Sequence, residues 1–120
     1  MRTTVNILGT EYKIIKKDYL DETYFEKSNF CGYCSYSTKT ICVGNLATFP
    51  EYQNESDLCI KTYEKETLRH EIIHAFLNES GLQDNTCTIK GAWAVNEEMI
   101  DWMSIQFPKI AKVFEELKIL

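Results

Sequence analysis

The sequence changes its periodicity near the middle of the chain, and this change constrains the fold more than any other feature. The first half contains β-branched and aromatic runs typical of strands, in residues 3–17 and 30–46. The second half carries apolar residues at helical spacing. Strands followed by helices indicate an α+β domain. Because 120 residues suit one hydrophobic core, we predict a single domain, residues 1–120.

Each strand-forming segment is expected to fold into an antiparallel hairpin. The first segment is broken at Gly9–Thr10, and the second has runs at Phe30–Tyr36 and Thr40–Val43. Residues 18–29, between the two hairpins, fit either a short helix or a loop. Residues 47–56 contain Pro, Asn and Ser and are predicted to form a loop.

The first long helix is predicted from about Tyr63 to Ser80. Thr62 is a candidate N-cap, and Gly81 is a candidate stop signal. An apolar stripe runs through this segment, formed by Leu68, Ile72, Ala75 and Phe76.

A second helix is predicted to begin near Trp93 and to end before Pro108. Proline lacks the N–H that a helix interior needs, so the helical pattern from Lys109 onward is expected to form a separate C-terminal helix.

Composition and charge exclude several classes of function. The net charge of −5 offers no basic surface for nucleic acid, and no dense run of Lys and Arg suits an anionic membrane. The sequence shows neither a secretion signal nor an apolar run long enough to span a bilayer, so a cytoplasmic location is expected. Nothing in the sequence indicates the oligomeric state.

The five cysteines are an odd number, which fits free thiols better than a disulfide framework. Cys31 and Cys34 form a single C-x-x-C pair without the second pair that a zinc ribbon requires. Their surroundings do not resemble the strand-to-helix junction of a thioredoxin-type motif. We therefore expect buried or half-buried thiols.

Both histidines of the chain, His70 and His74, lie four residues apart in the first long helix. Residues at this spacing project from the same helix face, so both imidazoles can bind one metal ion. Glu71, the next residue after His70, is placed to reach a water on that metal, as in H-E-x-x-H metallopeptidases. The alternative is a helix that carries two histidines without binding metal.

A catalytic zinc site requires a third protein ligand, and the chain contains no third histidine. A carboxylate or thiolate must therefore complete the site. Glu97 and Asp101 lie four residues apart at the start of the second helix and share one face. Glu98 is the alternative to Glu97 as the third ligand. If it is not a ligand, it is expected to be a charged residue on the solvent-facing side of the helix.

The motif "HEIIH" followed by "NEEMID" resembles the gluzincin pattern H-E-x-x-H and N-E-x-x-x-D. The two motif helices resemble more closely the small zincin-like peptidases of phages and integrative elements in Gram-positive bacteria, which are related to the ImmA/IrrE group. This resemblance implies a minimal zincin-like fold and one Zn²⁺ per chain, bound by His70, His74 and Glu97. It also implies that Asp101 hydrogen-bonds His70.

The expected function is a zinc-dependent metallopeptidase, with endopeptidase action favoured over aminopeptidase action. Glu71 would act as the general base in hydrolysis of a protein or peptide substrate. The alternative is a non-catalytic, zinc-containing module from a phage or mobile element that binds a protein partner.

Several other residues are candidates for contacts with the substrate. Besides the metal, a side chain could stabilise the negative charge that develops on the carbonyl oxygen during hydrolysis. The candidates for this role are Tyr33, Tyr36, Tyr52, Tyr63 and Arg69. The segment Lys39–Leu46 is the candidate edge strand for binding an extended peptide, and a buried inner strand is its alternative. Trp93 and Trp102 could line the cleft, although packing in the core or at its rim is the more common role of tryptophan.

Overall fold

The computed structural model describes residues 4–81, 96–116 and 118–119. A four-stranded sheet contains β1 (Thr4–Ile7), β2 (Thr10–Lys17), β3 (Gly32–Ser35) and β4 (Thr40–Gly44), in the order β1-β2-β4-β3. The α+β class and both hairpins are as predicted.

The sheet is mixed, because β2 and β4 pair in parallel. The antiparallel pairing predicted for the hairpins therefore does not extend across the whole sheet. A parallel pair requires a crossover connection. Residues 18–39 form this connection, which contains a 3₁₀ turn, η1 (Tyr19–Asp21), the short helix α1 (Thr23–Ser28) and the strand β3. This resolves the segment that the sequence left undecided in favour of a helix.

The predicted loop at residues 47–56 contains short 3₁₀ turns, η2 (Leu46–Thr48) and η3 (Pro50–Tyr52). The long helix that follows, α2 (Asp57–Glu79), begins earlier than predicted. Its N-cap is Ser56, whose hydroxyl accepts a hydrogen bond from the Cys59 backbone N–H at 3.2 Å. The predicted cap, Thr62, lies inside the helix.

Gly81 follows the end of α2, as predicted. Its φ of +84° is the left-handed conformation that glycine adopts readily, and its N–H donates to the Asn78 carbonyl.

The last helix, α3 (Glu97–Glu116), is continuous through Pro108. The prediction of two helices separated by this proline is therefore wrong. A proline removes only one intrahelical hydrogen bond, and the helix can continue where that loss is compensated. The predicted start near Trp93 lies outside the described residues.

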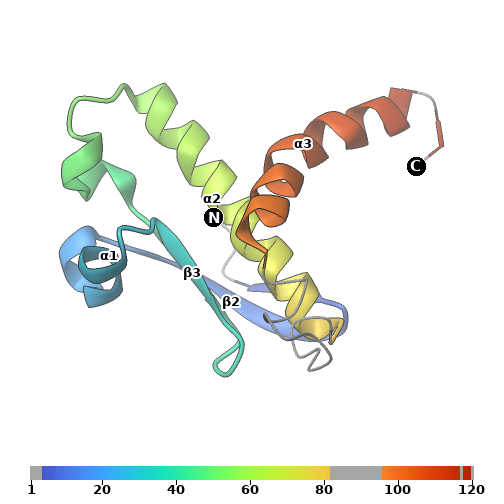
Figure 1. Cartoon of the computed structure of the whole chain (residues 1–120), viewed down its shortest axis with the longest axis horizontal. Coiled ribbons are helices and arrows are strands. Elements are labelled where there is room, and N and C mark those ends of the chain that lie inside the picture. Colours follow the sequence, from blue (N-terminus) through green and yellow to red (C-terminus); the bar gives the residue numbers. More distant parts are fainter. Residues whose placement is uncertain (1–3, 82–95, 117, 120) are drawn as a thin grey trace.

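Helix α2 packs against the sheet, and the first part of α3 packs against α2 (Figure 1). The main core lies between the sheet and α2 and is formed by Ile7, Tyr12, Ile14, Ile41, Val43 and Ala75. A second core cluster joins α1 to the region that follows β4, through Phe25, Cys42, Leu46 and Phe49.

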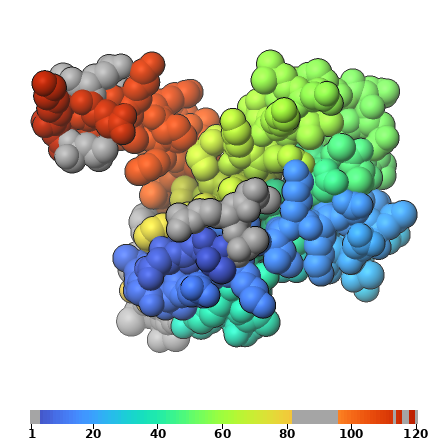
Figure 2. Space-filling view, turned by 180° about the vertical axis from the view of Figure 1, so that it is seen from behind, coloured from blue at the N-terminus to red at the C-terminus, as the bar shows by residue number. Residues whose placement is uncertain are grey.

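The C-terminal part of α3 stands clear of the rest of the molecule (Figure 2). Within the described ranges, no helix combines the length and the hydrophobicity needed to cross a membrane.

Glu79 ties the C-terminal end of α2 to the sheet. Its carboxylate accepts hydrogen bonds from the Thr10 hydroxyl at 2.8 Å, the Tyr12 hydroxyl at 2.7 Å and the Lys39 ammonium at 2.8 Å. These donors, with the bond from Lys39 as the largest cause, lower the pKa of Glu79 to about 2. All three bonds favour the ionised carboxylate.

We predict that this carboxylate contributes to stability above its unfolded-state pKa of 4.5 and that the contribution disappears as pH falls toward 2. The variant Glu79→Gln should be less stable than the wild type at neutral pH, and the difference should shrink between about pH 4.5 and pH 2. Urea unfolding across this range measures the difference. A difference that does not change with pH would contradict this assignment.

Candidate metal centre

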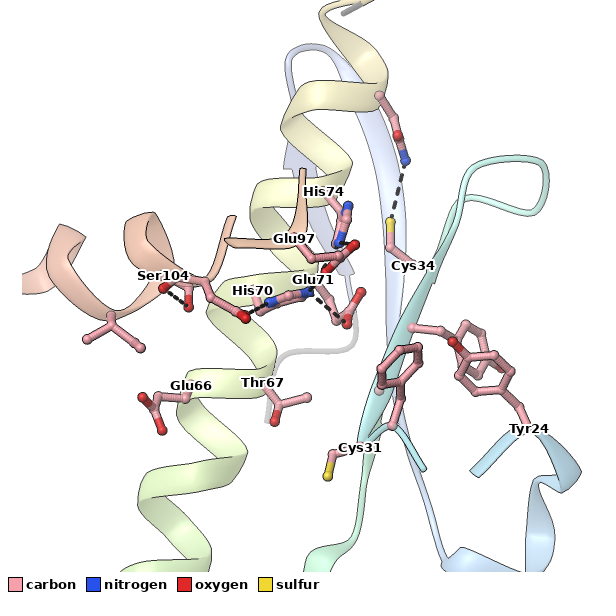
Figure 3. Close-up of a pocket in the computed structure, with 16 residues that line it drawn as sticks. Tyr24, Cys31, Cys34, Glu66, Thr67, His70, Glu71, His74, Glu97 and Ser104 are labelled. Atoms are coloured by element: carbon pink, nitrogen blue, oxygen red, sulfur yellow. Dashed lines mark hydrogen bonds and ion pairs between the residues drawn. The ribbon is translucent and has the colours of Figure 1, made fainter. Parts of the chain in front are cut away.

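The three predicted metal ligands converge at the contact between α2 and α3. The Nε2 atoms of His70 and His74 are 3.1 Å apart. Glu97, the first residue of α3, places one carboxylate oxygen 3.1 Å from His70 Nε2 and the other 3.2 Å from His74 Nε2. Figure 3 shows these three side chains pointing toward one another.

The spacing of these donor atoms suits a tetrahedral zinc ion. Bonds of about 2.0–2.1 Å at tetrahedral angles place neighbouring ligand atoms about 3.3–3.4 Å apart. The observed separations of 3.1–3.2 Å are close to that value. Two imidazole nitrogens and one carboxylate oxygen also form a ligand set typical of catalytic zinc, with a fourth position left for water.

The orientation of the His70 ring is fixed by Asp101. The Nδ1–H of His70 donates to Asp101 Oδ1 at 2.6 Å, because an ionised carboxylate can only accept. In the neutral ring, Nε2 then carries a lone pair that faces the Glu97 carboxylate and His74. Lone pairs converging at this distance repel one another unless a cation or a proton lies between them, so the donor set fits a metal ion.

Glu71 lies beside the three predicted ligands and is only 6% exposed. One of its carboxylate oxygens is 3.9 Å from His70 Nε2. Burial raises the pKa of Glu71 from 4.5 to about 8, and the nearby charges of Glu97 and Asp101 add to the rise. Burial also lowers the pKa of His74, which favours the neutral imidazole that a metal requires.

All five predicted site residues are thus brought together. Glu97 contacts the imidazoles although its side chain is 60% exposed, whereas Glu98 is exposed and does not line the cleft. Helical spacing explains this difference, because Glu97 and Asp101 project from one face of α3 and Glu98 is rotated away from it.

A cleft of about 700 Å³ opens over this centre between α2 and β3. The strand that borders it is β3, an edge of the sheet, whereas β4 lies between β2 and β3. The prediction that Lys39–Leu46 forms the edge strand is therefore wrong, and its alternative of an inner strand holds. The parallel pairing of β2 with β4 buries β4 and leaves β3 outermost.

Gly32 allows β3 to lie close to α2. A Cβ atom at this position would come within 2.7 Å of Thr67 Cγ2 and of the Cys42 carbonyl oxygen. Any larger side chain would therefore push β3 away from α2 and widen the cleft.

Three of the tyrosines proposed to stabilise an oxyanion do not line the cleft. The Tyr36 ring lies under the Lys39 ammonium, 3.7 Å from the ring centroid. The Tyr52 hydroxyl contacts Cys31 Sγ at 3.6 Å, and the Tyr63 ring packs against Tyr52.

The other two predicted candidates have partners elsewhere. Tyr33 lines the cleft, but its hydroxyl donates to Glu22 at 3.2 Å, and Arg69 donates to a backbone carbonyl of α3. Tyr24 of α1 also lines the cleft and was not predicted, because it lies in the segment whose structure the sequence left open. Burial raises the pKa of Tyr24, which keeps its phenol protonated.

The half-buried thiols of Cys31 and Cys34 also line the cleft. Cys34 Sγ accepts a hydrogen bond from the Asn78 amide at 3.7 Å, and burial raises the pKa of this thiol to about 12. These thiols are therefore poor nucleophiles.

Trp102 is 59% exposed on α3, so it is not buried in the core, and it does not line the cleft. Trp93 and Cys87 lie outside the described residues.

No family model matches this chain, and no curated protein or solved structure is significantly similar to it. The functional argument therefore depends on the geometry of the centre itself.

We predict that the ionised Glu71 carboxylate destabilises the metal-free protein. Since its pKa rises from 4.5 to about 8 on folding, stability is lost as pH increases through this interval. In EDTA-treated protein, Glu71→Gln should increase the free energy of unfolding at about pH 8 by on the order of 3 kcal/mol and leave it nearly unchanged at about pH 4.

Chemical denaturation at both pH values measures this effect. Glu98→Gln, which alters an exposed neighbour of the site, is the matched control and should change neither value. Equal effects of Glu71→Gln at the two pH values would contradict a buried, ionisable carboxylate.

Proposed function

We propose that this protein is a zinc-dependent metallopeptidase of the gluzincin kind with a minimal zincin-like fold. One observation carries the proposal: the Nε2 atoms of His70 and His74 lie 3.1 Å apart, and each lies 3.1–3.2 Å from one oxygen of the Glu97 carboxylate, close to the edge length of a zinc tetrahedron. The buried carboxylate of Glu71 stands beside them. His70, His74 and Glu97 would bind the ion, and Asp101 would hold the His70 ring.

Zinc bound at these residues acidifies a water molecule and polarises a carbonyl group. Glu71 would supply the base, because its carboxylate lies beside the proposed metal ligands and the positive charge of a bound ion would favour its ionised form. It would accept a proton as the water oxygen adds to the scissile carbonyl carbon. The carbon–nitrogen bond then breaks, and Glu71 returns this proton to the nitrogen of the leaving amine.

The cleft suits an extended peptide. The edge strand β3 borders it, and the outer main-chain groups of an edge strand can pair with a substrate strand. Aromatic side chains of Tyr24 and Phe30 line the same cleft and could contact substrate side chains. A protein or peptide is therefore the substrate class that this site favours.

The burial of Glu71 favours catalysis over the alternative of a non-catalytic binding module. Burying a carboxylate is costly, and Glu71 accepts no hydrogen bond from the described residues that would offset this cost. A module that only binds a partner has no use for such a group beside the metal.

We predict that the wild type binds one zinc ion per chain and that Glu97→Ala weakens zinc binding by at least about 100-fold, because two imidazoles alone make an incomplete site. Competition with a chromophoric chelator measures the affinity. Glu98→Ala is the matched control and should bind zinc like the wild type. Equal losses in the two variants would assign the effect to charge at the start of α3 rather than to coordination.

We predict that Glu71→Gln retains zinc and the fold but lowers the rate of peptide hydrolysis by at least about 100-fold, since general-base catalysis is lost. Mass spectrometry of a proteome-derived peptide library measures cleavage, and Glu98→Gln is the active control. A wild-type protein that binds zinc but cleaves no peptide would favour the binding module. Cleavage by Glu71→Gln at the wild-type rate would exclude Glu71 as the base.

A further inference from the structure

Pro108 lies inside α3 and leaves a backbone carbonyl without its helical partner. In an α-helix, the N–H of residue 108 would donate to the Ser104 carbonyl, but proline has no N–H. The proline ring also crowds this carbonyl and tilts it away from the helix axis. Ser104 is only 3% exposed, so its carbonyl must find another donor within the protein.

Arg69 of α2 supplies that donor. Its Nε–H donates to the Ser104 carbonyl oxygen at 2.8 Å. A charged donor makes a stronger hydrogen bond than a neutral one, and part-burial protects this bond from water. The proline that would normally weaken α3 therefore creates the acceptor that joins α3 to α2.

The neighbouring residue makes a second bond between the same helices. His70 follows Arg69 in α2, and its Nδ1–H donates to the Asp101 carboxylate at 2.6 Å. Within α3, the Ser104 hydroxyl donates to the Asp101 carbonyl at 3.1 Å. Two consecutive residues of α2 thus hold two residues on adjacent turns of α3.

This pair of bonds sets the position of Glu97. Glu97 lies one turn before Asp101, and its side chain is 60% exposed, so packing around the side chain provides little support. Its carboxylate reaches both imidazoles only if α3 keeps its register on α2. A shift of about 1 Å along the helix would exceed the tolerance of about 0.2 Å on zinc–ligand distances.

We infer that Arg69 and Pro108 are positioning residues, which act together through the Ser104 carbonyl to place Glu97 and Asp101 against the histidine pair. The inference rests on the proposed zinc site for its functional meaning. Arg69 would act in this role through the Ser104 carbonyl rather than by contact with the proposed metal ligands.

The variant Pro108→Ala separates positioning from general stability. Alanine restores the N–H, returns the Ser104 carbonyl to the helix axis and competes with Arg69 for it. Thermal unfolding of the metal-free variant should therefore occur at the wild-type temperature or above. Its zinc dissociation constant should nevertheless increase by about 10-fold, because Glu97 and Asp101 lose their fixed register.

Arg69→Lys provides the second variant, since lysine keeps the charge but lacks the planar Nε–H donor. It should weaken zinc binding by a similar factor. Lys109→Ala, at an exposed position next to the proline, is the matched control and should leave the zinc dissociation constant unchanged.

A measurement without metal keeps this inference distinct from the proposed function. Nitrogen-15 NMR of the imidazole rings reports the His70 tautomer, which the bond to Asp101 holds in the Nδ1–H form. Pro108→Ala and Arg69→Lys should each give a mixture of tautomers, whereas Lys109→Ala should not. This result supports the inference even if the wild type binds no zinc and the proposed function fails.

Two results would overturn the inference. The first is wild-type zinc affinity together with the wild-type tautomer in both variants. The second is a loss of zinc affinity only in proportion to a loss of folded metal-free protein, which would assign the bond a purely structural role.

Discussion

The packing of α3 on α2 is the constraint on which the candidate centre depends. Helix α2 contributes both imidazoles and the buried carboxylate of Glu71, and these groups share a single rigid element. The remaining proposed ligand, Glu97, and the acceptor for His70 come from α3. The buried side chain of Ile100 lies between Glu97 and Asp101 in the sequence, so the core contact of α3 and its polar contacts occupy the same turn of helix.

The features that the sequence predicts best are those set within one helix. The shared face of His70 and His74, and that of Glu97 and Asp101, follow from helical geometry alone, and the structure brings both pairs together. The stop at Gly81 likewise depends only on the local backbone. None of these inferences requires knowledge of how distant segments pack.

The features that the sequence predicts poorly depend on distant segments. The order of the strands follows from the parallel pairing of β2 with β4, which no local pattern reveals, and it moves the free edge from β4 to β3. The Ser104 carbonyl that Pro108 leaves without its helical donor accepts a hydrogen bond from Arg69, which is remote from it in the sequence. Tyr24 lines the cleft because the segment between β2 and β3 contains the helix α1. The sequence of this segment has too weak a periodicity to predict that helix.

In the proposed zinc site the ligands are divided between two helices, and this division has a thermodynamic consequence. An ion that binds both imidazoles and Glu97 stabilises the association of α2 with α3 by the same free energy that this association adds to its affinity. Glu79 anchors α2 to the sheet independently of that ion. Losing the ion would therefore loosen the C-terminal helix first. Zinc binding and the packing of α3 on α2 would then be coupled, and each would strengthen the other by the same free energy.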